Sequence, residues 1–187
     1  VLRLDCMSEI ETAYEVDMAA INGPKEKLYD AVLAKVSADD DNAAEGCSRW
    51  KCPRKVVEAD LTHDAELKQN LLAAGFDDET KPTLVLAEGL IMYLAENNKD
   101  EQLLRDISEL VLDNSWLILN YMEVDPTAPK YPGSPSITAT RIEEILSEGG
   151  WKDFLFNCYG DDVLNYGRYL NNEYEPSKYF SFLVCRK

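Results

Sequence analysis

The fold is decided by residues 82–94, which read Pro82-Thr-Leu-Val-Leu-Ala-Glu-Gly-Leu-Ile-Met-Tyr-Leu94. Residues 83–87 form a nearly continuous apolar run, long enough for a strand buried on both faces and too short for a helix. The run ends in Glu88-Gly89, which places a carboxylate at the carboxyl end of the strand and a glycine where the backbone can turn sharply. Because ligands bind beside the carboxyl ends of strands in open α/β sheets, we expect a site here.

Two upstream runs have the same form. Residues 11–17 and 55–60 are short, strand-like and end in an acid. Three consecutive strands that finish in Asp17, Asp60 and Glu88 would bring three carboxylates to one edge of one sheet. A single acid in this position is commonly a helix cap. Three in series suggest a ligand that carries hydroxyl groups and a cationic group.

Length and composition predict one globular domain, residues 1–187. The chain has 187 residues, of which 45% are hydrophobic, enough for a sizeable core. Its net charge of −16 disfavours nucleic acid or an anionic membrane as a partner. Because no apolar run reaches the length of a membrane span and no signal-peptide pattern is present, we expect a cytoplasmic protein, and we expect it to be monomeric.

Cysteine and histidine usage argues against a metal site. The five cysteines are an odd number without CxxC spacing, and His63 is the only histidine. Reduced thiols of a cytosolic protein are the simpler interpretation. An acidic loop is expected at residues 37–54, but it lacks the glycine and terminal glutamate of a calcium-binding loop.

Helical periodicity predicts four helices. Pro24 is expected to open the first of them. The next two are expected at residues 67–75 and 100–113, where apolar residues recur at helical spacing. Thr140 and Glu143 have the spacing of a capping box, which would begin the fourth helix.

The remaining apolar segments predict strands. They lie at residues 116–124, 151–157 and 178–186, and the last two form a C-terminal strand region within residues 151–187. Strands and helices therefore alternate along most of the chain. This order predicts an α/β fold with an open, mostly parallel sheet.

Each candidate site residue has two interpretations. Asp17 either accepts hydrogen bonds from a ribose diol or caps a helix, and spacing alone leaves both open. Asp60 and Thr62 either cap a helix, which is favoured, or contact the exocyclic amine of an adenine. Glu88 follows so apolar a strand that it needs a partner, and the amino group of a ligand would supply one. Tyr93 either places a phenol beside the site or packs in the core or at its rim, and packing is favoured for an isolated tyrosine.

No motif for nucleophilic catalysis or phosphate binding is present. His63 is followed by Asp64, but no serine or cysteine motif beside them supplies a nucleophile. The sequence contains no Walker loop, no GxGxxG and no GxSxG.

Taken together, these segments resemble the leucine carboxyl methyltransferase family, whose members are S-adenosylmethionine-dependent enzymes with the Rossmann-like class I fold. The resemblance covers most of residues 1–157. It rests on Tyr14-Glu-Val-Asp17, Ala59-Asp-Leu61, Leu71-Leu-Ala-Ala-Gly-Phe76, residues 82–94, Leu117-Ile-Leu-Asn-Tyr121, Glu123 and Ile145-Leu-Ser-Glu-Gly-Gly-Trp151.

The resemblance implies roles for five residues. Asp17 would hold the ribose hydroxyls of S-adenosylmethionine, Asp60 and Leu61 the adenine, and Glu88 the methionyl end, while Tyr93 would lie near the substrate carboxylate. The family transfers a methyl group to an oxygen, often that of a carboxylate. Its best-known acceptor is the C-terminal leucine of the type 2A protein phosphatase catalytic subunit, and other relatives methylate small metabolites or a modified tRNA base.

The sequence departs from the family in one respect. The glycine-rich cofactor loop and the first strand are expected just upstream of residue 1, and in the class I sheet that strand is central. The strands that end in Asp17 and Glu88 would both pair with it. One alternative is therefore a truncated, inactive pseudo-methyltransferase or binding module. A nicotinamide-dependent dehydrogenase ranks last, because no Tyr-x-x-x-Lys motif is present.

Overall fold

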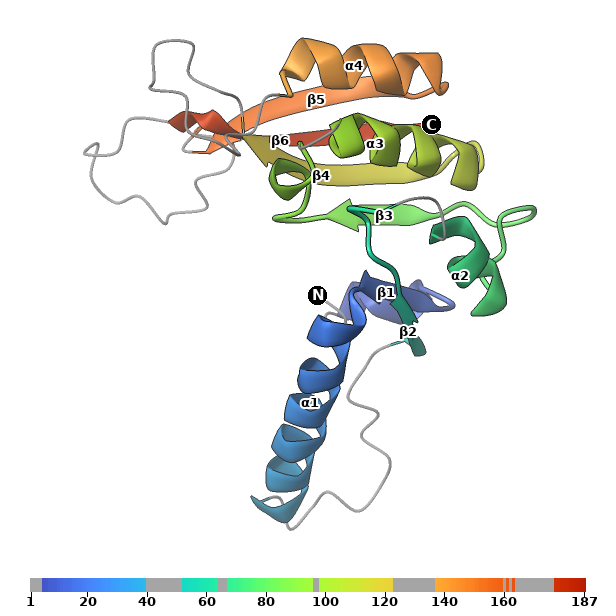
Figure 1. Cartoon of the computed structure of the whole chain (residues 1–187), viewed down its shortest axis with the longest axis vertical. Helices are drawn as coiled ribbons and strands as arrows, with labels where there is room; N and C mark the ends of the chain where they lie inside the picture. The colour runs from blue at the N-terminus through green and yellow to red at the C-terminus, as the bar shows by residue number, and fades with distance from the viewer. Residues whose placement is uncertain are drawn as a thin grey trace. The chain divides into compact units, whose positions relative to one another are not determined.

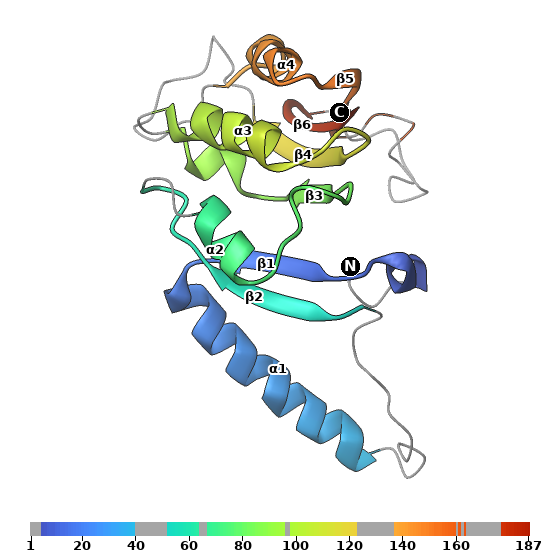
Figure 2. The same ribbon diagram turned by 90° about the vertical axis from the view of Figure 1, so that its right-hand side faces the viewer.

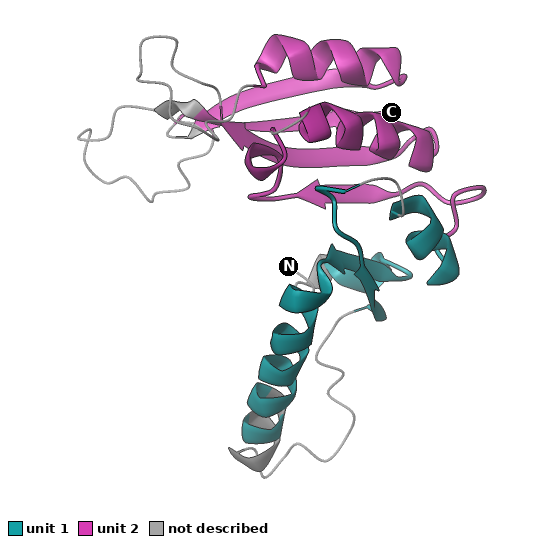
Figure 3. Cartoon of the chain, viewed as in Figure 1, with its two compact units in different colours: residues 1–76 teal, residues 77–187 magenta. Residues whose placement is uncertain are grey.

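The computed structural model consists of two compact units, residues 1–76 and 77–187 (Figure 3). It describes residues 5–39, 52–63, 67–95, 98–122, 137–159, 161, 163 and 177–187. Most of the acidic loop expected at residues 37–54 lies outside this part of the chain, and so does Glu123.

Unit 1 is a parallel pair of strands with a helix on each side (Figure 2). Its elements are η1 (Asp5–Glu9), β1 (Ala13–Asp17), α1 (Ala19–Asp39), β2 (Arg54–Glu58) and α2 (Leu67–Ala73). The register sets Asp17 opposite Glu58, so the carboxyl ends of both strands meet at one edge. Both strands were predicted, but β2 ends at Glu58, which leaves Asp60 in the turn that follows.

The first helix begins earlier than predicted. We expected Pro24 to open it, whereas α1 starts at Ala19 and contains Pro24. A proline inside a helix removes one backbone hydrogen bond. Tertiary contacts outweigh that loss: the buried Asn22 donates from Nδ2 to the carbonyls of Asp17 (3.0 Å) and Val57 (3.4 Å), which fixes the first turn against both strands.

Unit 2 is a four-stranded sheet with two helices on one face (Figure 1). The strand order is β3-β4-β6-β5, in which β3 and β4 are parallel and β6 is antiparallel to both neighbours. Its elements are β3 (Leu84–Ala87), η2 (Ile91–Tyr93), α3 (Lys99–Leu110), β4 (Trp116–Met122), α4 (Ala139–Glu148), β5 (Lys152–Tyr159) and β6 (Ser177–Arg186). These strands and helices were predicted, with shifts of a few residues at their ends.

The core of unit 2 lies between the sheet and its helices. Alternate residues of β4 and β6, including Leu117, Leu119 and Leu183, are buried with Leu104 of α3 and Leu146 of α4. This alternation is the pattern of a sheet covered on one face.

The prediction that β3 is buried on both faces is wrong. Leu84 and Leu86 are each 49% exposed, although Ala87 is buried on the helix-covered face. The register continues this exposed face from Leu86 through Ile118 and Val184 to Leu155. The apolar run could not distinguish one covered face from two, because the position of the helices is a tertiary property.

The start of α4 also differs from the prediction. Thr138, and not Thr140, is the N-cap, and its side chain accepts a hydrogen bond from the backbone N–H of Arg141 (3.2 Å). By contrast, the end of α2 is as expected. Gly75 has φ +84° and its N–H bonds to the carbonyl of Leu72, a conformation that a glycine adopts without strain.

Among the described strands, β1 of unit 1 and β3 of unit 2 are edge strands. Among the described residues, β1 pairs only with β2, and β3 pairs only with β4. Each of the two strands therefore has one edge without a strand partner in this part of the chain.

Candidate functional site

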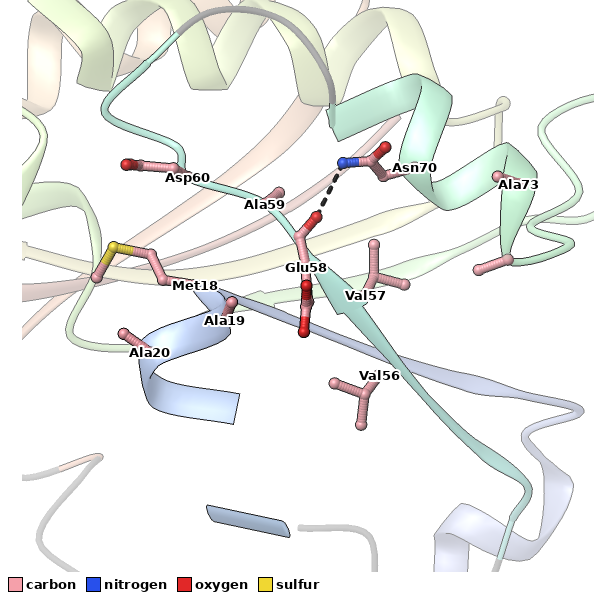
Figure 4. Close-up of a pocket in the computed structure, with 11 residues that line it drawn as sticks. Met18, Ala19, Ala20, Val56, Val57, Glu58, Ala59, Asp60, Asn70 and Ala73 are labelled. Carbon is pink, nitrogen blue, oxygen red and sulfur yellow. Dashed lines mark hydrogen bonds between the residues drawn. The ribbon is translucent and has the colours of Figure 1, made fainter. Parts of the chain in front are cut away.

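A pocket of about 730 Å³ lies in unit 1 at the carboxyl end of β2 (Figure 4). Its walls come from the start of α1, the end of β2 with the turn after it, and α2. The lining residues are Met18, Ala19, Ala20, Val56, Val57, Glu58, Ala59, Asp60, Asn70, Ala73 and Ala74. Five of these are alanines, whose short side chains leave the space open.

Asp60 lines this pocket and is tied to its own turn. Its Oδ1 accepts hydrogen bonds from the backbone N–H (3.0 Å) and the hydroxyl (2.6 Å) of Thr62, and its Oδ2 lies 3.0 Å from Nδ1 of His63. The hydrogen bonds from Thr62, with a smaller contribution from His63, lower the pKa of the Asp60 carboxyl. Asp60 is therefore an ionised acceptor at neutral pH, held in place by the turn.

Asp17 lies next to the pocket, directly before Met18. Its Oδ1 accepts the N–H of Met18 (2.9 Å), which is a local contact at the start of α1. Its carbonyl accepts the N–H of Ala59 (3.1 Å) and so joins the two strand ends. Leu61 is half-buried in the turn after Asp60. Unit 1 thus brings Asp17 and Asp60, two of the three acids expected at one edge, to the same edge of the β1–β2 pair, with Leu61 next to Asp60.

Glu88 and Tyr93 belong to unit 2. Glu88 is exposed, so water can solvate its carboxylate, and the argument that burial forces a partner on it is wrong. Gly89 has φ +64° and its N–H donates to Oδ1 of the buried Asn120 (2.6 Å), which fixes the turn after β3. Tyr93 is 75% exposed, which excludes packing in the core, one of the two packing roles favoured for it as an isolated tyrosine. A three-acid edge that includes Glu88 stays a prediction, because Glu88 is in a different unit from Asp17 and Asp60.

Sequence reasoning did not assign most of the pocket residues, among them Glu58, Met18 and Asn70. Glu58 is the β2 acid that lies opposite Asp17, and Met18 is the exposed residue that follows Asp17. Asn70 donates from Nδ2 to the carbonyl of Glu58 (2.8 Å) and thereby attaches α2 to the strand end. Glu58 could have been found from the register of two parallel strands. No sequence signal marks Asn70, because its role depends on how α2 packs.

In the described part of the chain, no group of three or more His, Cys, Asp and Glu side chains could hold a metal ion. None of the described helices is both long and apolar enough to cross a membrane.

The model of one protein family, described as leucine carboxyl methyltransferase, matches residues 1–108, which is more than half of the chain. The chain belongs to the leucine carboxyl methyltransferase family. The match confirms the resemblance seen in the sequence and includes Asp17, Asp60, Glu88 and Tyr93. A search of curated proteins found no significant match.

Solved methyltransferase structures share the fold. An O-methyltransferase family protein from Burkholderia thailandensis superposes with a TM-score of 0.52 at 9% identity, over 98% of this chain and 54% of that one. A SAM-dependent methyltransferase from Archaeoglobus fulgidus gives 0.50 at 11% identity, over 96% and 87%. The fold is therefore the Rossmann-like α/β fold of these two methyltransferases. A possible exported protein from Bordetella parapertussis gives a TM-score of 0.42 at 16% identity, over 73% of this chain and 54% of that one. The chain thus spans about half of the length of two of these three proteins.

The pocket residues fit the adenosine part of S-adenosylmethionine, the cofactor of the family. A volume of about 730 Å³ is typical of small-molecule sites. Met18 and Val56 offer apolar surface to a base, and the thioether of Met18 suits contact with an aromatic ring. The carboxylates of Asp60 and Glu58, with that of Asp17 beside the pocket, are acceptors for hydroxyl and amino groups.

Proposed function

We propose that this protein takes part in methyl transfer from S-adenosylmethionine to a carboxylate oxygen. One observation carries the proposal: in a chain of the leucine carboxyl methyltransferase family, a pocket lies where β1 and β2 end, with Asp60 in its wall and Asp17 beside it. This position at the carboxyl ends of parallel strands is where α/β proteins of this kind bind ligands.

The residues of unit 1 would hold the adenosine. Asp17 would accept hydrogen bonds from the ribose hydroxyls. Asp60 and Leu61 would contact the adenine edge, with Asp60 kept ionised by Thr62. Met18, which lies between Asp17 and α1, would form an apolar wall against the base.

The residues of unit 2 would bind the methionyl end of the cofactor and the methyl acceptor. Glu88 would bind the ammonium group at the methionyl end, and Tyr93, with 75% of its surface exposed, is available to contact the acceptor. S-Adenosylmethionine supplies an electrophilic methyl group on a sulfonium sulfur. A carboxylate acceptor is ionised at neutral pH and needs no general base. The contribution of the protein is then to hold the acceptor oxygen in line with that methyl group.

The acceptor we propose is the C-terminal leucine of a type 2A protein phosphatase catalytic subunit, or a small carboxylate. The description of the matching family, leucine carboxyl methyltransferase, supports this choice.

Calorimetric titration with S-adenosylhomocysteine tests the proposal. We expect Asp17→Asn and Glu88→Gln each to weaken binding by more than about 1 kcal/mol, or about fivefold, because each loses a charge-assisted hydrogen bond. Asp30→Asn, an exposed acid of α1 outside the pocket, is the matched control and should bind like the original chain. Unchanged affinity in both site variants would refute the site.

A transfer assay tests the acceptor. A peptide with a free C-terminal leucine should become methylated, and the same peptide with an amidated C-terminus should not. Equal methylation of both peptides would show that the acceptor is an atom other than those of the terminal carboxylate. Binding of S-adenosylhomocysteine without transfer to any carboxylate would favour a binding module.

A further inference from the structure

A chain of alternating charges runs between the β1–β2 pair and α1, and it ends at Asp17. Arg54 of β2, whose side chain is 7% exposed, donates from both terminal nitrogens to Glu26 of α1 (3.1 and 2.7 Å). Its Nε donates to Glu15 of β1 (2.5 Å), and its guanidinium carbon lies 5.1 Å from the ring centroid of Tyr29. Arg54 therefore fixes Glu15 and α1 in position relative to each other.

Lys25 continues this chain from Glu15 to Asp17. Its Nζ lies 2.6 Å from Oε1 of Glu15 and 3.6 Å from Oδ2 of Asp17. Partial burial pulls the pKa of Lys25 down, but its hydrogen bond to Glu15 and the charges of Glu15 and Asp17 outweigh this and raise it. Lys25 is therefore a fixed positive charge beside Asp17.

The two oxygens of Asp17 differ in their surroundings. Oδ1 accepts the N–H of Met18 at 2.9 Å. Oδ2 lies 3.6 Å from Nζ of Lys25, a distance longer than a hydrogen bond, so the two groups attract each other as charges. The attraction can thus orient the carboxylate without using the acceptor capacity of Oδ2. The backbone of Met18 and the ammonium of Lys25 together restrain the carboxylate at two points.

We propose that Lys25, held by Glu15, is a positioning residue that orients the Asp17 carboxylate toward the ribose hydroxyls of the cofactor. The inference rests on the proposed function. A lysine that served only to fasten α1 to β1 would need the contact with Glu15 and not the one with Asp17. The contact between Lys25 and Asp17 connects the charges of Arg54 and Glu15 to the carboxylate at the end of β1.

Two ligands that differ only in the ribose hydroxyls distinguish a positioning role of Lys25 from a purely structural one. The probes are S-adenosylhomocysteine and its 2′,3′-dideoxy analogue, which lacks the hydroxyls that Asp17 would bind. Lys25→Met should weaken binding of S-adenosylhomocysteine about fivefold and leave binding of the dideoxy analogue within about twofold of the original chain. Lys25→Arg, which keeps the charge, should restore most of the preference. Lys27→Met, an exposed lysine on the same helix, is the matched control and should change neither affinity.

The outcomes distinguish this inference from the proposed function. If the original chain binds S-adenosylhomocysteine more tightly than the dideoxy analogue and Lys25→Met keeps that preference, the positioning role is wrong and the proposed function stands. A similar loss of affinity for both ligands would assign Lys25 a structural role only. If the original chain binds neither ligand, both proposals are wrong. Should Lys25→Met lose its secondary structure in circular dichroism, Glu15→Gln, which releases Lys25 but keeps its charge, serves as the second variant and should reduce the preference.

Discussion

Unit 1 and unit 2 are each stabilised internally by different interactions. In unit 2, side chains such as Leu104, Leu117 and Leu146 are fully buried between the sheet and its helices. In unit 1, every residue of β1 is only half-buried, and Arg54 of β2 binds both Glu15 of β1 and Glu26 of α1, which joins the two strands to the helix. The pocket lies in the unit with the smaller apolar core. Its geometry therefore depends on charges and hydrogen bonds, which respond to pH, salt and ligands more than close packing does.

The largest effect is expected from the core of unit 2. Leu146→Ala removes a fully buried side chain of α4 and should lower the free energy of unfolding by about 2–5 kcal/mol, because the cavity cannot close completely. Urea unfolding followed by the fluorescence of Trp151 measures it. Trp151 is buried and donates from Nε1 to the hydroxyl of Ser108 (2.8 Å), so it reports on this core. Leu155→Ala, on the exposed face of the same unit, is the control and should change the stability little. Equal effects of the two substitutions would contradict the assignment of the core.

A smaller and more local effect is expected in unit 1. Arg54→Met keeps the apolar length of the side chain but leaves Glu15 and Glu26 without their shared cation. We expect a loss of about 1–3 kcal/mol, between the values typical of exposed and of fully buried ion pairs. Amide hydrogen exchange should show faster exchange in β1 and β2 and unchanged exchange in β4 and β6. A loss of protection spread over both units would mean that the network does not stabilise unit 1 alone.

The contacts of Arg54 with Glu15 and Glu26 should also make the free energy of unfolding depend on pH, which gives a second measurement for Arg54→Met. Burial raises the pKa of Glu15, but hydrogen bonds from Lys25 and Arg54 outweigh this and leave it below 4.5; the hydrogen bond from Arg54 lowers the pKa of Glu26 as well. The folded state thus favours the ionised forms. Their contribution to stability is complete above about pH 4.5 and is lost as the pH falls through the lowered folded values. Arg54→Met should flatten this acid dependence.

The sequence predicted the edge of the site because its signal is local. A short apolar run followed by an acid is enough to place Asp17 at the end of a strand and Asp60 close after the end of the next, and parallel pairing then brings them to one edge. Asn70 and the 49% exposure of Leu86 could not be predicted in this way. Both depend on which helix packs against which face, and adjacent residues carry no information about that.

Two local signals were misleading for the same reason. Pro24 is a good first residue for a helix, yet the buried side chain of Asn22 extends α1 to Ala19 through contacts with both strands. Thr140 has the spacing of a capping box, but Thr138 makes the cap. Where two local starts compete, the tertiary contacts decide between them.

The smallest loss of stability is expected from breaking an exposed ion pair in unit 2. Comparison of this pair with the more buried pair of unit 1 shows how much burial contributes to the strength of an ion pair. Arg105 and Glu148 meet at 2.7 Å, the same distance as Arg54 and Glu26 in unit 1. The side chains of the first pair are 39% and 61% exposed, whereas those of the second are 7% and 43% exposed. Water and salt screen the exposed pair, so Arg105→Met should leave the urea midpoint unchanged within error, in contrast to Arg54→Met. Equal losses in the two variants would mean that distance, and not burial, sets the strength of these pairs, and the contrast between the two units would then not explain their stability.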